Sequence, residues 1–450
     1  MKIVFEYRDA DEGVCITKYR GEASVLRIPD MIEDQPVGEL DEYVFYESSA
    51  GLEKIIVPDT VKRNRPYAFA MCSELKEIVL GDGVEILGEE FSQATAVKKI
   101  FIPASVRTIE APEEMECAIE ADPESPYFMT DGFGLYRRTD QGLYLLSVSA
   151  ETEKEGYMAA EGTVSIREKA LRGNGYLRRL ILPDSIREIP EGALSGSKRS
   201  GGSGEGIEDI RITGSGGPFY ISDGCLYRAA GGDGAELVYC FRKRKEITLP
   251  EDVRVIDSFA FVNCGAESLT ISSDDIDIHK DAFRGCPLQE VILAGPERRE
   301  HGGTRITFPT SVAHLREDLM EGFGSGSGIY DFAEYDRTLI NAYLSRERID
   351  MMLNRLENPE ALTEESRTGI LSRIKNEWEK VLEIIVKEDD RQAVESICRQ
   401  ELLGAEDLDE WIRFLSEFGE GFGTSAREKM VTLTAYKNER FRNVRHDYSL

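Results

Sequence analysis

The chain has 450 residues, of which 84 are acidic and 55 are basic, so its formal net charge is −29. A surface this negative repels phosphate backbones and anionic lipid, which excludes nucleic acid and anionic membranes as favoured partners. Hydrophobic residues make up 41% of the chain, enough for an extended core and a second domain. No stretch is long enough to span a bilayer, and residues 1–10 lack the apolar core of a signal peptide, so we expect a cytoplasmic protein without membrane insertion.

A hydrophobic frame of the form L-x-x-I-x-I returns about every 22 residues through the first part of the chain. Three consecutive copies begin at Leu52, Leu75 and Val97, with spacings of 23 and 22 residues. Two apolar positions separated by one residue point to the same face of a short strand, and Pro or Gly after the frame ends that strand. A unit of this size cannot bury its apolar face alone, so the period predicts a solenoid of stacked turns.

Between the frames, an Ala-aromatic pair recurs, in three copies with a Cys three residues later: Ala68-Phe69 with Cys72, Ala260-Phe261 with Cys264, and Ala282-Phe283 with Cys286. The segments LEKIIVPDTVKRNRPYAFAMC (52–72) and ITLPEDVRVIDSFAFVNC (247–264) combine both signatures. In these segments the chain resembles the BspA-like, or Treponema-type, family of bacterial leucine-rich repeats. The resemblance covers roughly residues 20–315. It implies a leucine-rich-repeat solenoid that binds other proteins and catalyses no reaction.

The repeats are interrupted twice by copies of one motif, SPYFMTDGFGLYRR at residues 125–138 and GPFYISDGCLYRAA at residues 217–230. Asp-Gly between two aromatic or β-branched runs is typical of a β-hairpin. We therefore predict two β-hairpin modules inserted into the solenoid, a device that also occurs in the BspA-like family. The Gly/Ser-rich residues 195–206 indicate a surface loop, because the frame resumes at Ile207.

After Phe308 the apolar spacing becomes helical, for example around Trp378 and Trp411. Thr363 and Asp407 have the character of helix starts, and Gly404 stands where a helix should end, so we expect about five helices between residues 330 and 441. The predicted fold is α+β: a leucine-rich-repeat solenoid with two hairpin modules (1–321), a Gly/Ser linker (322–329) and an all-α C-terminal domain (330–450). The helices could cap the open end of the solenoid.

Cysteine placement favours a structural role. Cys72, Cys264 and Cys286 occupy the repeat's own buried Cys position, where a small apolar side chain packs well. Cys225 and Cys240 flank the second hairpin, and the sequence leaves open whether they pair across it or stay as thiols. No C-x-x-C spacing points to zinc.

Catalytic chemistry has no signature in this chain. The four histidines are dispersed, and metalloprotease, serine-hydrolase, P-loop and dinucleotide-binding motifs are missing. Asp274, Asp275 and Asp277 lack the glycine and distal glutamate of a calcium loop, which favours a solvated turn. We therefore predict no catalytic residues, no cofactor and no metal.

The sheet face of the solenoid is the best candidate for a contact surface. In each frame, the residue between the last two apolar positions points away from the core. From these positions we choose as candidate protein contact face Ile56, Val79, Phe101, Ile181, Arg211 and Ile292; the others are Arg27, Thr248, Thr270 and Thr307. Ile56, Val79 and Phe101 belong to consecutive repeats, so we expect an apolar ladder with about 4.8 Å per step. The alternatives are that such residues simply suit strands, or that a hairpin or the helical domain covers them.

Three hypotheses follow for function. The first is a cytoplasmic, non-enzymatic scaffold that holds another protein on the solenoid face and on the C-terminal helices. The second keeps the binding mode but places the protein on the cell surface, in contact with host or neighbouring cells. The third is an enzyme with a site at the junction of solenoid and helices. The partner, the oligomeric state and whether the helices bind or only cap are left open.

Overall fold

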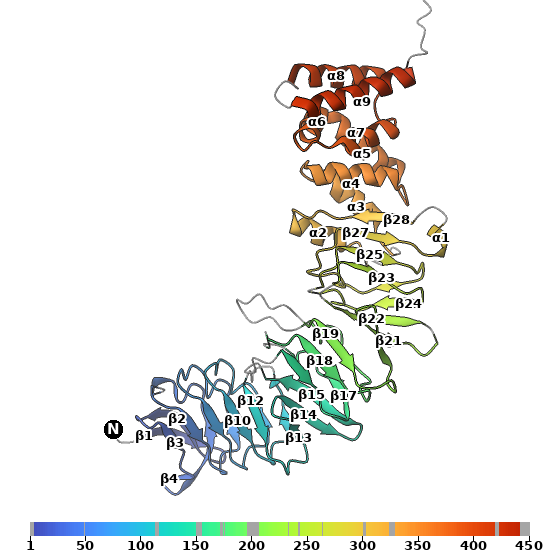
Figure 1. Ribbon diagram of the computed structural model, residues 1–450. Helices are drawn as coiled ribbons and strands as arrows, with labels where there is room; N and C mark the ends of the chain where they lie inside the picture. Colours follow the sequence, from blue (N-terminus) through green and yellow to red (C-terminus); the bar gives the residue numbers. More distant parts are fainter. Residues whose placement is uncertain are drawn as a thin grey trace, which may run out of the picture. The chain divides into compact units, whose positions relative to one another are not determined.

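The computed structural model contains a β-solenoid of about 11 turns followed by a helical region, as predicted (Figure 1). It describes residues 4–441 except 49, 113–116, 150–154, 172–173, 175, 196–206, 233, 242–243, 263, 300–302, 324–328 and 419–422. The predicted surface loop and the predicted linker fall largely outside the described residues. The chain divides into two compact units: unit 1 comprises residues 1–243 and 257–264, and unit 2 comprises residues 244–256 and 265–450. The domain boundaries expected from the sequence remain a prediction.

Unit 1 is organised by a parallel sheet to which each repeat contributes one short strand. Its strands, in spatial order, are β3 (Val25–Arg27), β6 (Lys54–Ile56), β8 (Glu77–Val79), β10 (Lys99–Ile102) and β12 (Ala118–Ala121). Within each strand the apolar frame residues, such as Ile55, Ile78 and Ile100, are buried, while their neighbours are partly exposed. After the strand the chain turns, as where Val61 N–H donates to Pro58 O at 3.2 Å. The frame therefore forms the strand and the turn that the sequence predicts.

A second row of short strands runs along another face of unit 1. It includes β5 (Gln35–Leu40) paired with β7 (Arg63–Asn64), and β9 (Ile86–Leu87) paired with β11 (Thr108–Ile109). An N-terminal hairpin of β1 (Val4–Ala10) and β2 (Gly13–Arg20) pairs onto β5, and β4 (Met31–Ile32) pairs with β5 as well. The β1–β2 hairpin was not predicted, because its turn lacks the Asp-Gly signature of the other two.

Both predicted hairpin modules are present. The first module consists of β13 (Phe128–Thr130), β14 (Gly134–Thr139) and β15 (Gly142–Val148), joined antiparallel. The second consists of β20 (Phe219–Ser222), β21 (Cys225–Ala229) and β22 (Ala235–Cys240) in the same arrangement. Between them, the repeats continue through β16 (Gly156–Met158), β17 (Thr163–Ile166), β18 (Arg179–Leu182) and β19 (Asp209–Ile212).

The repeat position of the aromatic residue in the Ala-aromatic pair lies in the interior of the solenoid. Phe45, Phe69 and Phe91 come from successive turns, are at most 1% exposed, and stack with ring centroids 5.8 and 5.4 Å apart. Stacking of like residues in neighbouring turns buries surface that no single turn can bury, at about 25 cal/mol per Å². The pair is thus a core element of the repeat.

Glu90 breaks this pattern, because it occupies the repeat position that Ala68 fills one turn earlier. The residue is 2% exposed; one carboxylate oxygen accepts a hydrogen bond from Gly88 N–H at 2.6 Å, and the other has no hydrogen-bond partner within the described part of the chain. Burial raises the pKa of Glu90 to about 7, from an ordinary value of 4.5. A core carboxylate with one unsatisfied oxygen destabilises the fold when it is charged.

The repeats of unit 2 form a second sheet. Strands β23 (Glu246–Thr248), β25 (Ser268–Ile271) and β27 (Glu290–Leu293) are parallel, and β28 (Thr304–Thr307) closes the sheet antiparallel. Strand β24 (Val253–Ile256) pairs with β26 (Asp277–Ile278), and the short helices α1 (Pro296–Arg299) and α2 (Ala313–Met320) flank β28 in sequence. Because β28 runs antiparallel, Arg305 lies opposite Ile292. Thr307 points away from the core, as expected, but it lies opposite Glu290 and not in line with Thr270 and Ile292.

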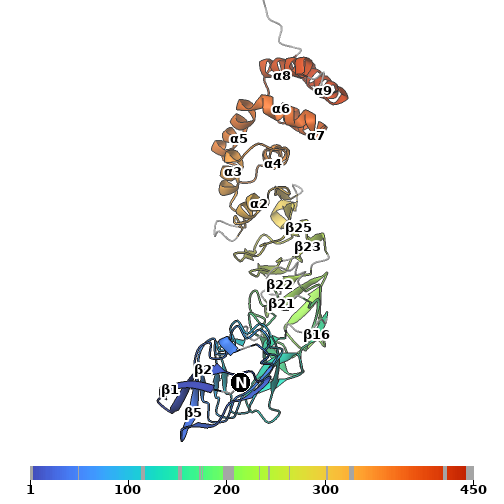
Figure 2. The same ribbon diagram turned by 90° about the vertical axis from the view of Figure 1, so that its left-hand side faces the viewer.

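Seven helices follow in the described part of residues 330–441, where about five were predicted. They are α3 (Phe332–Asn341), α4 (Arg346–Glu357), α5 (Glu364–Asn376), α6 (Trp378–Lys387), α7 (Arg391–Arg399), α8 (Ala405–Phe418) and α9 (Gly423–Phe441) (Figure 2). Thr363 caps α5 by accepting from Ser366 N–H at 3.0 Å, as predicted. The start predicted at Asp407 was wrong: α8 begins at Ala405, and the Asp407 carboxylate reaches back to Gly404 N–H at 2.8 Å. Gly404 therefore precedes a helix and does not end one.

The helical region has a core of its own. Trp411 is 2% exposed and stacks on Trp378, which joins α8 to α6. Arg355 and Asp336, at most 4% exposed, form a two-pronged ion pair with distances of 2.6 and 3.2 Å that joins α4 to α3. Removing one partner of such a pair would leave a buried charge. Among the described residues, none of the helices combines the length and hydrophobicity that crossing a bilayer requires.

We expect Glu90→Gln to stabilise the protein at pH 8 but not at pH 4. The folded-state pKa lies above the unfolded one, so the wild-type unfolding free energy falls as the pH rises from 4.5 to about 7. The loss at pH 8 is about 3 kcal/mol at most. Urea unfolding at several pH values measures it, with the exposed Glu89→Gln as matched control. Equal pH dependence in the wild type and in Glu90→Gln would contradict the assignment.

Candidate functional site

The predicted apolar ladder is formed on the sheet of unit 1. Ile56 lies opposite Val79, and Val79 lies opposite Phe101, in the parallel register of β6, β8 and β10. All three side chains are partly exposed, and Arg27 and Glu120 extend the same column at its two ends. Three apolar side chains in adjacent strands thus present one continuous stripe on an open sheet face.

A row of charged residues runs beside the stripe. Lys54, Glu77 and Lys99 are paired in register, one on each of the same three strands. Lys54 contacts Glu77 at 2.9 Å, and Lys99 contacts Glu120 at 2.9 Å. These ion pairs are largely solvated and contribute little stability, but they give the stripe a border of alternating charge. The combination of an apolar centre and a charged border is typical of protein interfaces.

The remaining candidates lie on separate strands. Ile181 lies between Met158 and Arg211 in the register of β16, β18 and β19. Met158 is 62% exposed and extends this second column. It was not predicted from the sequence, because its segment has only two of the three apolar residues of the frame. Ile292 belongs to unit 2, opposite Thr270 on one side and Arg305 on the other. The three residues of the first ladder are therefore brought together, whereas the other candidates are not part of it.

Unit 2 contains a groove between its sheet and helix α4. The cavity measures about 590 Å³ and is lined mostly by polar side chains, namely Lys245, Glu246, Glu267, Ser268, Gln289, Glu290, Thr307, Phe308, Thr310, Glu347, Asp350, Met351 and Asn354. This is where the third hypothesis placed an enzyme site. Carboxylates do converge here, but none of the described lining residues is a histidine.

Most of these carboxylates already have structural partners. Glu267 pairs with Lys245 at 2.8 Å, Glu290 accepts from Ser268 Oγ at 2.8 Å, and Glu347 accepts from Thr310 N–H at 3.1 Å. Partial burial and the neighbouring Asp390 raise the pKa of Asp350 to about 6. Asp390, however, caps α7, and Arg346 contacts it at 3.2 Å. Groups committed to capping and ion pairing are poorly suited to acid–base catalysis, so the groove does not favour an enzyme.

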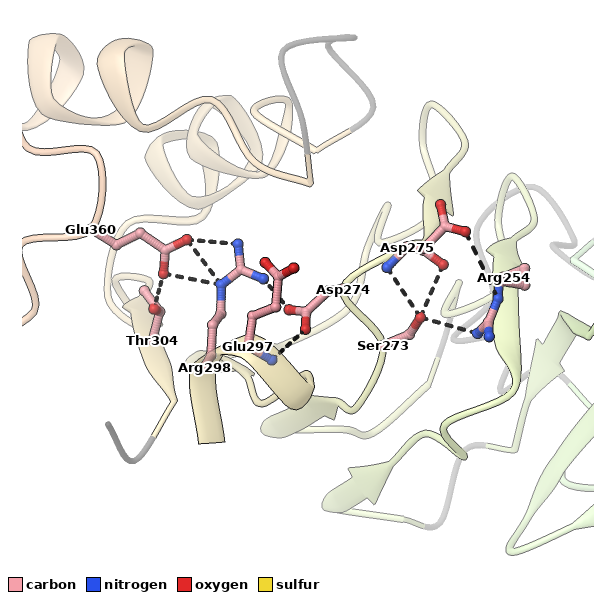
Figure 3. A network of polar contacts seen from close by, with 8 residues as sticks. All are labelled: Arg254, Ser273, Asp274, Asp275, Glu297, Arg298, Thr304 and Glu360. Atoms are coloured by element: carbon pink, nitrogen blue, oxygen red, sulfur yellow. Dashed lines mark hydrogen bonds and ion pairs between the residues drawn. The ribbon is translucent and has the colours of Figure 1, made fainter. Parts of the chain in front are cut away.

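A polar network joins the helical region to the repeats within unit 2 (Figure 3). Arg298 donates to both oxygens of Glu360, at 2.9 and 3.2 Å, and it also contacts Asp274. Thr304 donates to the same Glu360 carboxylate, and Asp274 accepts from Glu297 N–H at 2.8 Å. We call Asp274, Arg298 and Glu360 the Arg298 cluster. Asp274 lies in a repeat turn, Arg298 in α1, and Glu360 in the loop between α4 and α5. This cluster fixes the first helices onto the last turns of the solenoid.

The same network extends into the preceding turn. Arg254 donates to Ser273 Oγ at 3.1 Å and lies 4.0 Å from the Asp275 carboxylate, and Ser273 Oγ donates to Asp275 O at 2.9 Å (Figure 3). Asp274 and Asp275 were expected to form a solvated turn. Asp275 is exposed, in agreement with that expectation, whereas the Asp274 side chain is only 18% exposed because Arg298 covers it.

The repeats can be assigned to a family. Residues 28–115 and 237–299 match the family described as "BspA type Leucine rich repeat region", in six copies. These segments are BspA-type leucine-rich repeats. The resemblance seen in the sequence is thereby confirmed, and so is the solenoid that it implies. A comparison with curated proteins finds no match.

Solved structures of bacterial leucine-rich-repeat proteins are also similar. A leucine rich cell surface protein from Faecalibacterium prausnitzii A2-165 is 19% identical over 66% of this chain and 94% of its own, with a TM-score of 0.30. The pneumococcal vaccine antigen PcpA is 16% identical over 56% of this chain and 64% of its own, with a TM-score of 0.38. A leucine-rich repeat protein from Bacteroides ovatus ATCC 8483 is 16% identical over 65% of this chain and 70% of its own, with a TM-score of 0.36. Likeness at this level says nothing about partners.

We expect Arg298→Gln to lower the unfolding free energy by about 1–3 kcal/mol, because it leaves two carboxylates without their charged hydrogen-bond donor. Urea unfolding of the full chain measures the change. Arg337→Gln is the matched control, since Arg337 pairs with Glu334 only at the surface, where the two side chains are 67% and 51% exposed. That pair contributes about 0–0.5 kcal/mol. Equal losses in both variants would mean that the Arg298 cluster does not hold the helices.

Proposed function

We propose that this protein is a non-enzymatic interaction protein that holds a partner protein on the sheet face of unit 1. One observation carries the proposal: Ile56, Val79 and Phe101 form an in-register apolar stripe on a face of the sheet that leaves them partly exposed. BspA-type repeats support it, because repeat solenoids typically bind proteins through their long sheet surfaces. The net charge of −29 supports a protein partner over a phosphate-bearing one.

The stripe needs an apolar partner surface to become buried. Side chains that are partly exposed in the free protein gain free energy when a partner removes them from water. The charged row beside the stripe then sets orientation and excludes mismatched partners, because desolvated unpaired charges are costly. We propose that the remaining candidates, Ile181, Arg211 and Ile292, contribute peripheral contacts only, since none of them lies in the stripe.

We expect Val79→Glu and Phe101→Glu each to weaken partner binding by about tenfold or more, because a carboxylate at the centre of an apolar contact is left unpaired. An affinity pull-down from native lysate identifies the partner, and titration with the purified partner measures the affinity. Thr270→Glu is the matched control, since it places the same charge at the same frame position on the sheet of unit 2. Circular dichroism and thermal unfolding confirm that each variant folds. Unchanged affinity in both folded variants would remove the stripe as the contact site.

The compartment separates the first two hypotheses but does not change the binding mode. We propose the cytoplasm, as expected from the sequence, and the alternative is a protein exported to the cell surface that contacts other cells. Cell fractionation with antibody detection distinguishes them. Recovery of the protein on intact, protease-accessible cells would establish the alternative.

A further inference from the structure

The two inserted hairpin modules are internal copies of each other, which allows their residues to be compared position by position. Phe128 lies opposite Arg137 in the first module, and Phe219 lies opposite Arg228 in the second. The last strand of each module donates to the Ala of the buried pair that follows it, Ala170-Leu171 or Ala260-Phe261: Val148 N–H to Ala170 O at 2.7 Å, and Cys240 N–H to Ala260 O at 2.8 Å. The backbones of the two copies therefore correspond.

Three buried positions differ together between these copies. Gly134 lies opposite Val148 in the first module, where Cys225 lies opposite Cys240 in the second. The third position follows the buried pair after each module, and it is Asn174 after the first module and Cys264 after the second. Asn174 Nδ2 donates to Ser149 O at 2.9 Å, and Cys264 Sγ lies 3.8 Å from the corresponding carbonyl, Phe241 O. One copy thus has no thiol at these positions, and the other copy has three.

The three sulfur atoms converge inside unit 1. Cys240 Sγ lies 2.8 Å from Cys264 Sγ and is also hydrogen-bonded to Cys225. Cys225 and Cys240 are 0% exposed, Cys264 is 2% exposed, and none of the three is joined in a disulfide. Cys240 is therefore the central thiol, with Cys264 in contact with it.

Packing alone explains only one of these thiols. Cys72 occupies the same repeat position as Cys264, is equally buried, and donates to Ala70 O at 3.5 Å. The repeat therefore accounts for Cys264, but Cys225 and Cys240 are specific to the second module. Thiols are not required by the module's backbone, because Gly134 and Val148 occupy these two positions in the first module.

The surroundings of Cys240 favour the neutral form of its thiol. Burial, followed by hydrogen bonds to Cys225 and Cys264, raises the pKa of Cys240 well above its ordinary value. A thiolate that stayed buried here would carry an uncompensated negative charge. A disulfide is uncharged and keeps two sulfurs in contact without that penalty.

We propose that Cys240 and Cys264 are a redox modification site. The two residues form an intramolecular disulfide by exchange with a low-molecular-weight disulfide, such as glutathione disulfide. One cysteine, as thiolate, attacks a glutathione sulfur, forms a mixed disulfide and releases one glutathione thiolate. The second cysteine then attacks the protein sulfur of that mixed disulfide and releases the second glutathione. The two cysteine protons end on the two glutathione thiols, so one disulfide is reduced and one is formed. The bond links the inserted module to the repeat turn that follows it.

The test starts with the folded full-length chain, incubated for a day with glutathione disulfide. The incubation is long because buried thiols react only through local opening. The reaction is quenched with acid, remaining thiols are alkylated in urea, and tryptic peptides are analysed by mass spectrometry. Trypsin separates the three cysteines, because Arg228 and Arg254 lie between them. We expect one reducible peptide pair containing Cys240 and Cys264, and a rise of several degrees in the midpoint of thermal unfolding.

Two variants serve as controls. Cys264→Ala should lose both the peptide pair and the thermal shift, whereas Cys72→Ala, at the same repeat position elsewhere, should keep both. Complete alkylation of Cys240 and Cys264 in the oxidised wild-type sample would overturn the proposal, and so would a link between Cys225 and Cys240. Since the peptide pair is measured on the wild-type chain, the test does not depend on how well either variant folds.

Discussion

A turn of about 22 residues has too few apolar side chains to enclose a core, so each turn of this protein must be covered by its neighbours. Coverage works only if equivalent residues lie in register, and the strands of unit 1 do so from β3 to β12. The same register that buries Ile55 beside Ile78 also places Ile56 beside Val79 on the opposite face. The candidate contact stripe is therefore a direct geometric consequence of core formation, and its chemistry is set by one residue per turn.

Stacking is strong enough to override local backbone preference. Tyr43, Tyr67 and Phe259 each precede the buried pair of their turn and adopt left-handed backbone angles, with φ of 52°, 62° and 62°. Bulky residues disfavour this region by about 1 kcal/mol or more, and glycine would adopt it freely. Hydrogen bonds between turns hold this backbone conformation in place; for example, Tyr43 N–H donates to Tyr67 O at 3.2 Å. The rings of Tyr43 and Tyr67 also stack at 5.6 Å, which offsets part of the strain.

The parts of this fold that the sequence predicted are those with a local or periodic cause. The frame, the Ala-aromatic core pair, both Asp-Gly hairpins and the Thr363 cap depend on residues close in sequence, and all are present. The features that were not predicted depend on residues far apart in the sequence. Strand β28 has the same frame as the parallel strands but pairs antiparallel, and the contact between Arg298 and Glu360 joins residues 62 positions apart. The ladder of Ile56, Val79 and Phe101 was predictable because its members share one frame position, whereas the groove beside α4 depends on tertiary packing.

The two hairpin modules show how one backbone accommodates different buried chemistry. In the first module, the hydroxyls of Tyr136 and Tyr157 both donate to Asp131, at 2.9 Å each. A Cβ atom at Gly134 would come within 2.0 Å of the Tyr157 hydroxyl, so only glycine fits there. The second module has Cys225 at that position. Strand register and the backbone hydrogen bond to the following turn are the same in both modules. The backbone is therefore common to both, while single buried positions change. Function in this protein is therefore to be sought at positions where neighbouring copies of a repeat or module differ.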